Sequence, residues 1–270
     1  MTTSASRTAE TATTTTTFEG LARAGYVARG VIYVLIGLLA VQLARGVGGG
    51  NPDQEGAMRL IADQAFGRVL LVIVAVGLAG YALWRATMAL VGRTPEAGRH
   101  SALDRVGAAG SAVAYGVFCA LAIGILAGSS GGGGDPGSGT ADVFGWPAGR
   151  LLVSIAGLVF IAIGAYQAYL GISRRFLKDS KTMYMSPRVL KGFTALGMIG
   201  LLARGVTFSL IGIFFLKAAI QYDSNEAKGL DGALYSLTTQ TYGRVALAIV
   251  AAGLIAFGAY SIADARYRKI

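Results

Sequence analysis

The chain has few charged residues, one cysteine and one histidine, and these shortages exclude several classes of protein. Only 14% of its 270 residues are charged, whereas a soluble domain has about 25%. The single cysteine, Cys119, cannot form an intrachain disulfide. With His100 as the one histidine, the chain lacks the ligands for a bis-histidine haem, a multi-histidine zinc site or a cysteine-ligated iron–sulfur cluster. We therefore expect neither a metal nor a cofactor.

Acidic residues are also missing from the apolar parts of the chain. No Asp or Glu occurs at 27–41, 69–90, 106–134, 151–170, 193–221 or 245–263. A proton-coupled transporter generally needs a titratable group inside its bundle, and glycoside hydrolysis needs paired carboxylates. The sequence therefore predicts a protein that is not an enzyme.

Apolar residues are abundant: 54% of the chain is hydrophobic, and its mean hydropathy is +0.57. They form six segments, at roughly 22–44, 67–90, 105–127, 149–171, 194–220 and 243–263. Each is long enough to cross a hydrocarbon core of about 30 Å at ~1.5 Å per residue. We therefore expect an all-α integral membrane protein with six transmembrane helices. The Thr-rich segment 1–17 has no apolar core, and we expect it to be a disordered tail.

The net charge of +10 is carried by loops between the apolar segments. Basic residues gather in the tail, in the loops 91–104 and 172–193, and at the C-terminus, whereas the other loops are richer in acid. This alternation predicts that both termini are cytoplasmic. The charge thus indicates membrane topology and does not indicate a nucleic-acid partner. We expect a multi-pass protein of the bacterial plasma membrane whose partners are membrane lipids or another membrane protein.

Three copies of a two-helix unit follow one another along the chain. The stretch Ala28-Arg29-Gly30 recurs as Ala203-Arg204-Gly205. In the second copy Ser111 takes the place of Arg29, and Tyr115 takes the place of Tyr33. The second helices open with Gly67-Arg68, Gly149-Arg150 and Gly243-Arg244. Because each unit has two spans, all three enter the membrane in the same orientation. They could close into a pseudo-threefold bundle, and a linear row is also possible.

The repeats divide the chain into the tail 1–17, repeat 1 at 18–93, repeat 2 at 94–175, a basic cytoplasmic loop at 176–192 and repeat 3 at 193–270. We call the first long helix of each unit the odd helix and the second the even helix. The tripled unit, with ARG-V-x-Y/F on the odd helix and GALxxL…GR before the even helix, is similar to a bacterial membrane family catalogued as domain-of-unknown-function family 1206. The resemblance covers about residues 18–268 and is weakest in repeat 2, where Ser111 replaces the Arg. It implies a six-helix membrane protein and supplies no chemistry.

Arg29 and Arg204 are the strongest candidates for a binding site. Each lies about two helical turns inside its segment, on the order of 10 Å deep. One interpretation is that the side chain snorkels to lipid phosphates. A second is a structural clamp on backbone carbonyls or Asp104. The third is a pocket for an anionic lipid headgroup or another anion.

Three further arginines and three interior residues complete the candidate sites. Arg68, Arg150 and Arg244 open the even helices and either anchor at the outer interface or form a ring that favours anions. Tyr33, Tyr115 and Ser111 are candidates for lining a cavity. Small residues such as Gly30 and Gly37 are expected to pack helices together. The sequence favours a structural or regulatory protein that binds anionic lipid or a protein partner. The alternative is a transporter or channel for an anion or small solute along a pseudo-threefold axis.

Overall fold

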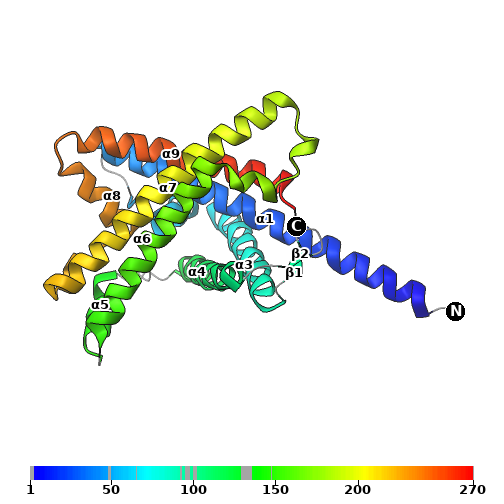
Figure 1. Cartoon of the computed structure of the whole chain (residues 1–270), viewed down its shortest axis with the longest axis horizontal. Coiled ribbons are helices and arrows are strands. Elements are labelled where there is room, and N and C mark those ends of the chain that lie inside the picture. The colour runs from blue at the N-terminus through cyan, green and yellow to red at the C-terminus, as the bar shows by residue number, and fades with distance from the viewer. Residues whose placement is uncertain are drawn as a thin grey trace.

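The structure, a computed structural model, describes residues 3–47, 50–64, 66–91, 93–94, 98–99, 102–128, 136–146 and 148–269. Six long helices dominate it (Figure 1): α1 (Thr3–Ala44), α3 (Gly67–Val91), α4 (Ala102–Leu126), α6 (Gly149–Ser173), α7 (Pro187–Gln221) and α9 (Gly243–Tyr267). All six are long and apolar enough to cross a membrane. The prediction of six membrane helices is confirmed to within a few residues, except that α7 begins earlier, at Pro187.

Short elements connect the long helices. One nine-residue helix precedes the second long helix of each unit: α2 (Gln54–Ala62), α5 (Pro136–Phe144) and α8 (Leu230–Thr238). The odd helices of the three units are α1, α4 and α7, and the even helices are α3, α6 and α9. The other elements are the two-residue strands β1 (Arg93–Thr94) and β2 (Gly98–Arg99), and the 3-10 helices η1 (Arg175–Asp179), η2 (Thr182–Tyr184) and η3 (Ser224–Glu226). Each unit therefore consists of a long helix, a short helix and a second long helix.

The first helix also includes most of the Thr-rich N-terminal segment. Helix α1 begins at Thr3, so it runs through the Thr-rich stretch before it reaches the apolar span at Ala22. Once a helix is nucleated, each added residue gains one backbone hydrogen bond. This gain offsets the low helix propensity of Thr.

A residue with a left-handed backbone conformation precedes each even helix, and a glycine follows it. The three left-handed residues are Phe66, Ala148 and Tyr242, with φ between 62° and 68°. A Cβ atom added to the glycine that follows each of them would collide with a carbonyl oxygen of the preceding short helix, those of Ile61, Val143 and Leu237 respectively. Only glycine permits so close an approach. The Gly of the repeated Gly-Arg pair is therefore a packing requirement.

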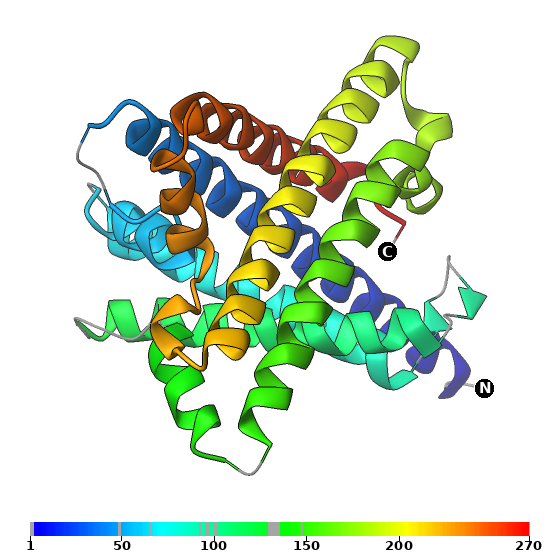
Figure 2. The same cartoon turned by 60° about the vertical axis from the view of Figure 1, so that its left-hand side comes forward.

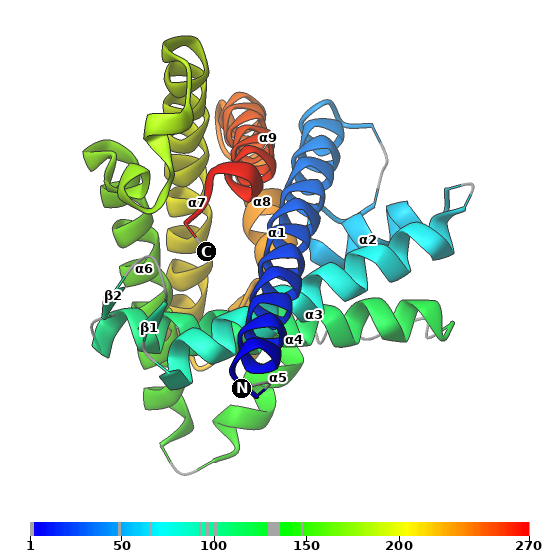
Figure 3. The same cartoon turned by 90° about the vertical axis from the view of Figure 1, so that its right-hand side faces the viewer.

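The six long helices associate as three tight pairs. The pairs are α9 with α1, α3 with α4 and α6 with α7, and they run side by side in Figures 1 and 3. Each pair joins the even helix of one unit to the odd helix of the next, and α9 of the last unit returns to α1 of the first. The chain thus follows the cyclic order of a ring, which we call the helix ring.

Glycines bring the backbones of two of these pairs together. A Cβ atom added to Gly30 would lie 2.7 Å from the Gly258 carbonyl oxygen, and one added to Gly205 would lie 2.8 Å from that of Gly164. In the α3–α4 pair, the Cys119 thiol reaches the Ala75 carbonyl oxygen at 3.5 Å. Small residues allow such close packing in lipid. The expected small-residue packing face is therefore present.

The helix ring is complete except on one side. Helices α1 and α3 pack together within the first unit, and α7 and α9 do so within the third. Helices α4 and α6 of the second unit barely touch along their described residues. Figure 2 shows the α6–α7 pair crossing the α3–α4 pair without running alongside it. The long helices therefore contact one another in the order α4, α3, α1, α9, α7 and α6, and the helix ring is open between α4 and α6.

Candidate functional site: a triad of arginines inside the helix ring

Each tight helix pair carries one arginine at the same level of the repeat. Arg29 lies on α1 of the α9–α1 pair, and Arg204 lies on α7 of the α6–α7 pair. In the α3–α4 pair the odd helix has Ser111, and the arginine, Arg85, lies on α3 instead. Its counterparts on the other even helices are Gln167 and Ser261. We call Arg29, Arg85 and Arg204 the arginine triad.

Arg29 is held inside the protein by two hydroxyl groups. It is 7% exposed. Its Nε donates to Ser261 Oγ at 2.8 Å, and its Nη1 donates to Tyr81 Oη at 3.0 Å. Ser261 Oγ donates in turn to the Tyr26 carbonyl oxygen at 2.9 Å. Arg29 therefore does not snorkel, and its position is fixed by α3 and α9 together.

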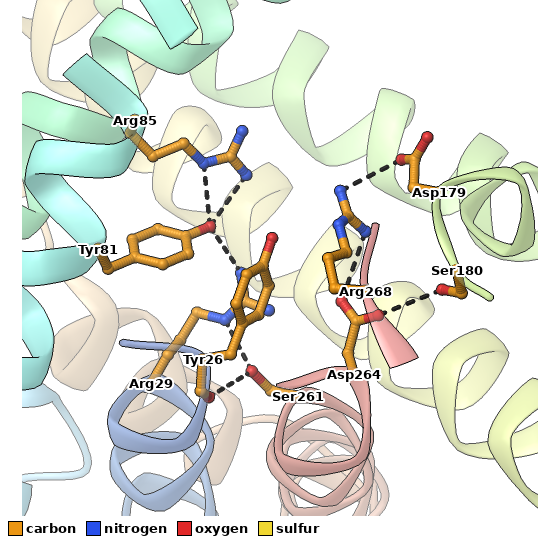
Figure 4. A network of polar contacts seen from close by, with 9 residues as sticks. All are labelled: Tyr26, Arg29, Tyr81, Arg85, Asp179, Ser180, Ser261, Asp264 and Arg268. Carbon is orange, nitrogen blue, oxygen red and sulfur yellow. Dashed lines mark hydrogen bonds and ion pairs between the residues drawn. The ribbon is translucent and has the colours of Figure 1, made fainter. Parts of the chain in front are cut away.

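Arg85 shares the same tyrosine hydroxyl. Its Nε and Nη2 approach Tyr81 Oη at 3.0 and 2.9 Å, as the i, i+4 spacing on one helix face allows. The Tyr81 oxygen thus accepts from two guanidinium groups at once, which Figure 4 shows. Arg85 is only partly buried, so its outer face can be approached. Two guanidinium groups are thus brought together around one tyrosine hydroxyl.

Arg204 lies over aromatic rings and is incompletely hydrogen-bonded. Its guanidinium carbon is 4.4 Å from the centroid of Phe257, 5.1 Å from that of Tyr33 and 5.2 Å from that of Phe208. Such cation–π contacts stabilise the charge by about 0.5–2 kcal/mol. Its Nε is buried without a hydrogen-bond partner, and so is Oε1 of Gln167, the repeat counterpart of the Ser261 that binds Arg29. The hydrogen bond made in the first site is missing in the second.

Carboxylates do not balance the triad. Among the side chains that the structure describes, no carboxylate oxygen forms an ion pair with Arg29, Arg85 or Arg204. The Asp104 side chain, which the clamp hypothesis invoked, lies outside the described residues. Phe257 lies under both Arg29 and Arg204, and Tyr81 joins Arg29 to Arg85. The three cations are therefore neighbours, linked by neutral rings and hydroxyls.

A separate acid–base network borders the triad on one side (Figure 4). Asp264 is 1% exposed, and its carboxylate accepts from Ser180 Oγ at 3.2 Å and from Arg268 Nη1 at 3.4 Å. Arg268 also pairs with Asp179 at 3.2 Å. The one buried acid near the triad is thus already occupied. The buried Tyr26 hydroxyl, beside Arg268, has no hydrogen-bond partner.

The other predicted residues lie in different places. Tyr33 is buried and packs edge-on against Phe257. Tyr115 is half-buried and close enough to Arg29 and Arg204 to interact electrostatically with both. Ser111 donates to the Gly107 carbonyl oxygen. The exposed arginines of the even-helix starts, Arg68, Arg150 and Arg244, do not join the triad, and Arg150 donates to the Ile220 carbonyl oxygen instead.

Sequence reasoning missed Arg85, Tyr81, Tyr26, Ser261 and Asp264. Asp264 lies one residue beyond the acid-free window 245–263. Arg85 carried a signal, because it stands 82 residues before Gln167, the spacing that relates Arg68 to Arg150. Metal sites give no competing candidate: no group of three or more His, Cys, Asp or Glu within the described residues could hold a metal ion.

Comparisons with known proteins agree with the repeats. The family model Domain of Unknown Function (DUF1206) matches three times, at residues 24–92, 106–174 and 199–268. A relative in Bacillus subtilis (strain 168), described as an uncharacterized protein YxxB, is 32% identical over 249 residues, which is 92% of this chain and 90% of the relative. No solved structure matches the chain. The chain belongs to the DUF1206 family, as the repeated sequence indicated.

Proposed function

We propose that this protein is a non-catalytic membrane component that binds the anionic headgroup of a lipid at the arginine triad. The observation that carries the proposal is the charge imbalance: three neighbouring guanidinium groups at one level of the membrane helices have no paired carboxylate among the described residues. Removing cations from water is costly unless an anion accompanies them. A bound anion would supply the missing charge.

The chemistry of the triad suits a phosphate group. A guanidinium presents planar pairs of N–H donors that match phosphate oxygens. Arg85 and Arg204 are partly buried and Arg204 Nε makes no hydrogen bond, whereas Arg29 is already committed to two hydroxyls. In this proposal Arg85 and Arg204 touch the headgroup, and Arg29 raises the local positive potential.

The proposed orientation places this site at the inner leaflet. The basic loops favour cytoplasmic termini. Arg29 and Arg85 lie near the ends of their spans on that side, at Ala22 and Val91, whereas Arg204 lies midway along α7. Anionic lipids give the cytoplasmic leaflet its negative surface potential. The headgroup level of that leaflet is therefore where the proposed ligand is found.

Passage of an anion along the axis of the helix ring has less support. Tyr33, which would line such a path, is buried and packed against Phe257. The outer arginines Arg68, Arg150 and Arg244 are exposed and do not contact the triad. A role as a docking partner for another membrane protein remains compatible with lipid binding.

Native mass spectrometry in nanodiscs of phosphatidylcholine with or without phosphatidylglycerol tests the proposal. Arg85→Gln and Arg204→Gln each remove a donor group from the site. Hydrogen bonds to charged groups contribute about 1.5–3 kcal/mol, so retention of phosphatidylglycerol is expected to fall roughly tenfold or more. Arg68→Gln removes the same charge from an exposed position and serves as the matched control.

Arg29→Lys separates charge from geometry. Lysine keeps the charge but cannot donate to Ser261 and Tyr81 through one planar group. The expected result is a lower melting temperature with most phosphatidylglycerol retained. Equal retention by the wild type, Arg85→Gln and Arg204→Gln would contradict the proposed function.

A further inference from the structure

The open side of the helix ring leaves a face of α6 uncovered that the other units bury. Val159 and Ile163 are 51% and 40% exposed. Their counterparts in the first unit, Gly77 and Tyr81, are buried against α1, and those in the third, Gly253 and Phe257, are buried against α7. The same positions thus have a covering helix in two units and none in the second.

The opposing face of α4 is equally empty. A Cβ atom added to Gly25 would lie 2.8 Å from the Gly77 carbonyl oxygen, and one added to Gly200 would lie 2.5 Å from Phe257 Cα. Their counterpart Gly107 has no atom within 4 Å of that position, and neither has Gly110 one turn later. Helix α4 therefore keeps the glycine of a tight crossing without the partner.

The side chains of the two faces are complementary in size. In the first unit Gly77 of the even helix meets the methyl group of Ala28, and in the third Gly253 meets that of Ala203. In the second unit the larger residue is on the even helix, Val159, and the position opposite is Gly110. The small and the large partner have changed sides, so the crossing can still be packed. The occupant that fits the α4 face is α6 of the same chain.

We propose that α6 docks on α4 in a second, closed conformation, with Val159 seated against Gly110, and that the open form is a lateral port through which a membrane lipid reaches the arginine triad. The port part of this inference rests on the proposed function. Apolar walls on both sides match an acyl chain. Ser111, on the α4 wall, lies at the level of the triad.

Two buried polar atoms on α6 and α7 have no hydrogen-bond partner and lie at the level of the triad. Gln167 follows Tyr166 on α6, and its buried Oε1 has no partner. The buried Nε of Arg204 also lacks one, and its guanidinium group is near Tyr115 of α4. A lipid headgroup entering between α4 and α6 would meet an acceptor and a donor that the protein leaves unused.

Disulfide trapping tests the docking. Gly110→Cys and Val159→Cys are combined in a Cys119→Ala background, and the protein is oxidised in phosphatidylcholine nanodiscs. A disulfide needs Cα atoms about 4.4–6.8 Å apart, which a crossing as close as that of Ala28 and Gly77 provides. We expect an intramolecular disulfide, and a rate at least fivefold lower when phosphatidylglycerol is present. The pair Ala112→Cys and Val159→Cys is the control, since Ala112 follows Gly110 by two residues and so lies on the other side of α4, and it should remain reduced.

Each alternative outcome overturns a stated part of the inference. No intramolecular disulfide in either lipid means that α6 does not dock on α4. Cross-linked dimers mean that a second copy covers this face instead. Equal rates in both lipids remove the port. If Arg85→Gln and Arg204→Gln leave lipid retention unchanged while the disulfide still forms, the proposed function and the port fail and the docking stands.

Discussion

Replacing Gly25, Gly107 and Gly200 by alanine, one at a time, tests whether the α4 face is uncovered. Each substitution adds a single methyl group at the same position of a different unit. The three glycines occupy the same position in the three units. At Gly25 the new Cβ would lie 2.8 Å from the Gly77 carbonyl oxygen, and at Gly200 it would lie 2.5 Å from Phe257 Cα. At Gly107 it would meet nothing within 4 Å. The chemical change is identical, so only the surroundings differ.

The magnitudes separate the three variants. Overpacking typically costs about 1–3 kcal/mol, and alanine in place of glycine inside a helix gains roughly 1 kcal/mol. Gly25→Ala and Gly200→Ala should therefore lose up to about 2 kcal/mol of stability. Gly107→Ala should lose none and gain up to about 1 kcal/mol. The difference between Gly107→Ala and the other two is the quantity to measure.

Thermal unfolding in one detergent, followed by the fluorescence of buried Trp84, gives the readout. A change of 1 kcal/mol shifts the melting temperature of a chain of this size class by about 2–4 °C. We expect Gly107→Ala to melt at or above the wild type, and the other two to melt several degrees below it. If Gly107→Ala is lowered as much as Gly25→Ala, the α4 face is covered in solution and the open helix ring is wrong.

Two further predictions concern the loops. Burial near Asp231 and Glu55 raises the pKa of the Asp53 carboxyl, the N-cap of α2, to about 6. The folded state therefore holds this proton more tightly than the unfolded state does. Stability should then fall as pH rises from about 4 to 6. Asp53→Asn keeps the cap and should flatten that melting profile, whereas an unchanged profile would assign the pH dependence to other groups. For topology, a cysteine at Met183, which is 96% exposed, should resist an impermeant thiol reagent in intact cells, and one at the exposed Gln64 should react, both in a Cys119→Ala background. The reverse labelling would invert the proposed orientation.

The membrane helices could be predicted from the sequence because their signal is local. A run of apolar residues reports its own burial in lipid, whatever surrounds it. The spans from Ala22 to Ala44 and from Gly67 to Val91 were therefore found within a residue of their bounds. The repeat spacing also gave the order of the units, since it depends on the chain alone.

The arginine triad could be predicted only in part. Comparing odd helices with odd helices found Arg29 and Arg204 and made Ser111 look like a loss. Arg85 was missed because its place beside Arg29 depends on α3 packing against α1, which no single helix reveals. The near-absence of contact between the described residues of α4 and α6 was hidden for a similar reason: hydropathy does not distinguish a residue that faces lipid from one that faces another helix.

In the second unit, an arginine and a glycine have each changed places between the odd helix and the even helix. The arginine has moved from the odd helix to the even helix, as Arg85, and Ser111 stands at the odd-helix position. The glycine of the crossing has moved from the even helix to the odd helix, with Val159 opposite Gly110. The charge and the volume at an interface depend on what both helices contribute, so either helix can supply them. The first exchange keeps one arginine in every helix pair, and Arg85 donates hydrogen bonds to Tyr81 Oη. The second keeps a crossing that could be packed, yet the two helices stand apart. The triad therefore takes one arginine from each helix pair, and it is assembled while the helix ring is open between α4 and α6.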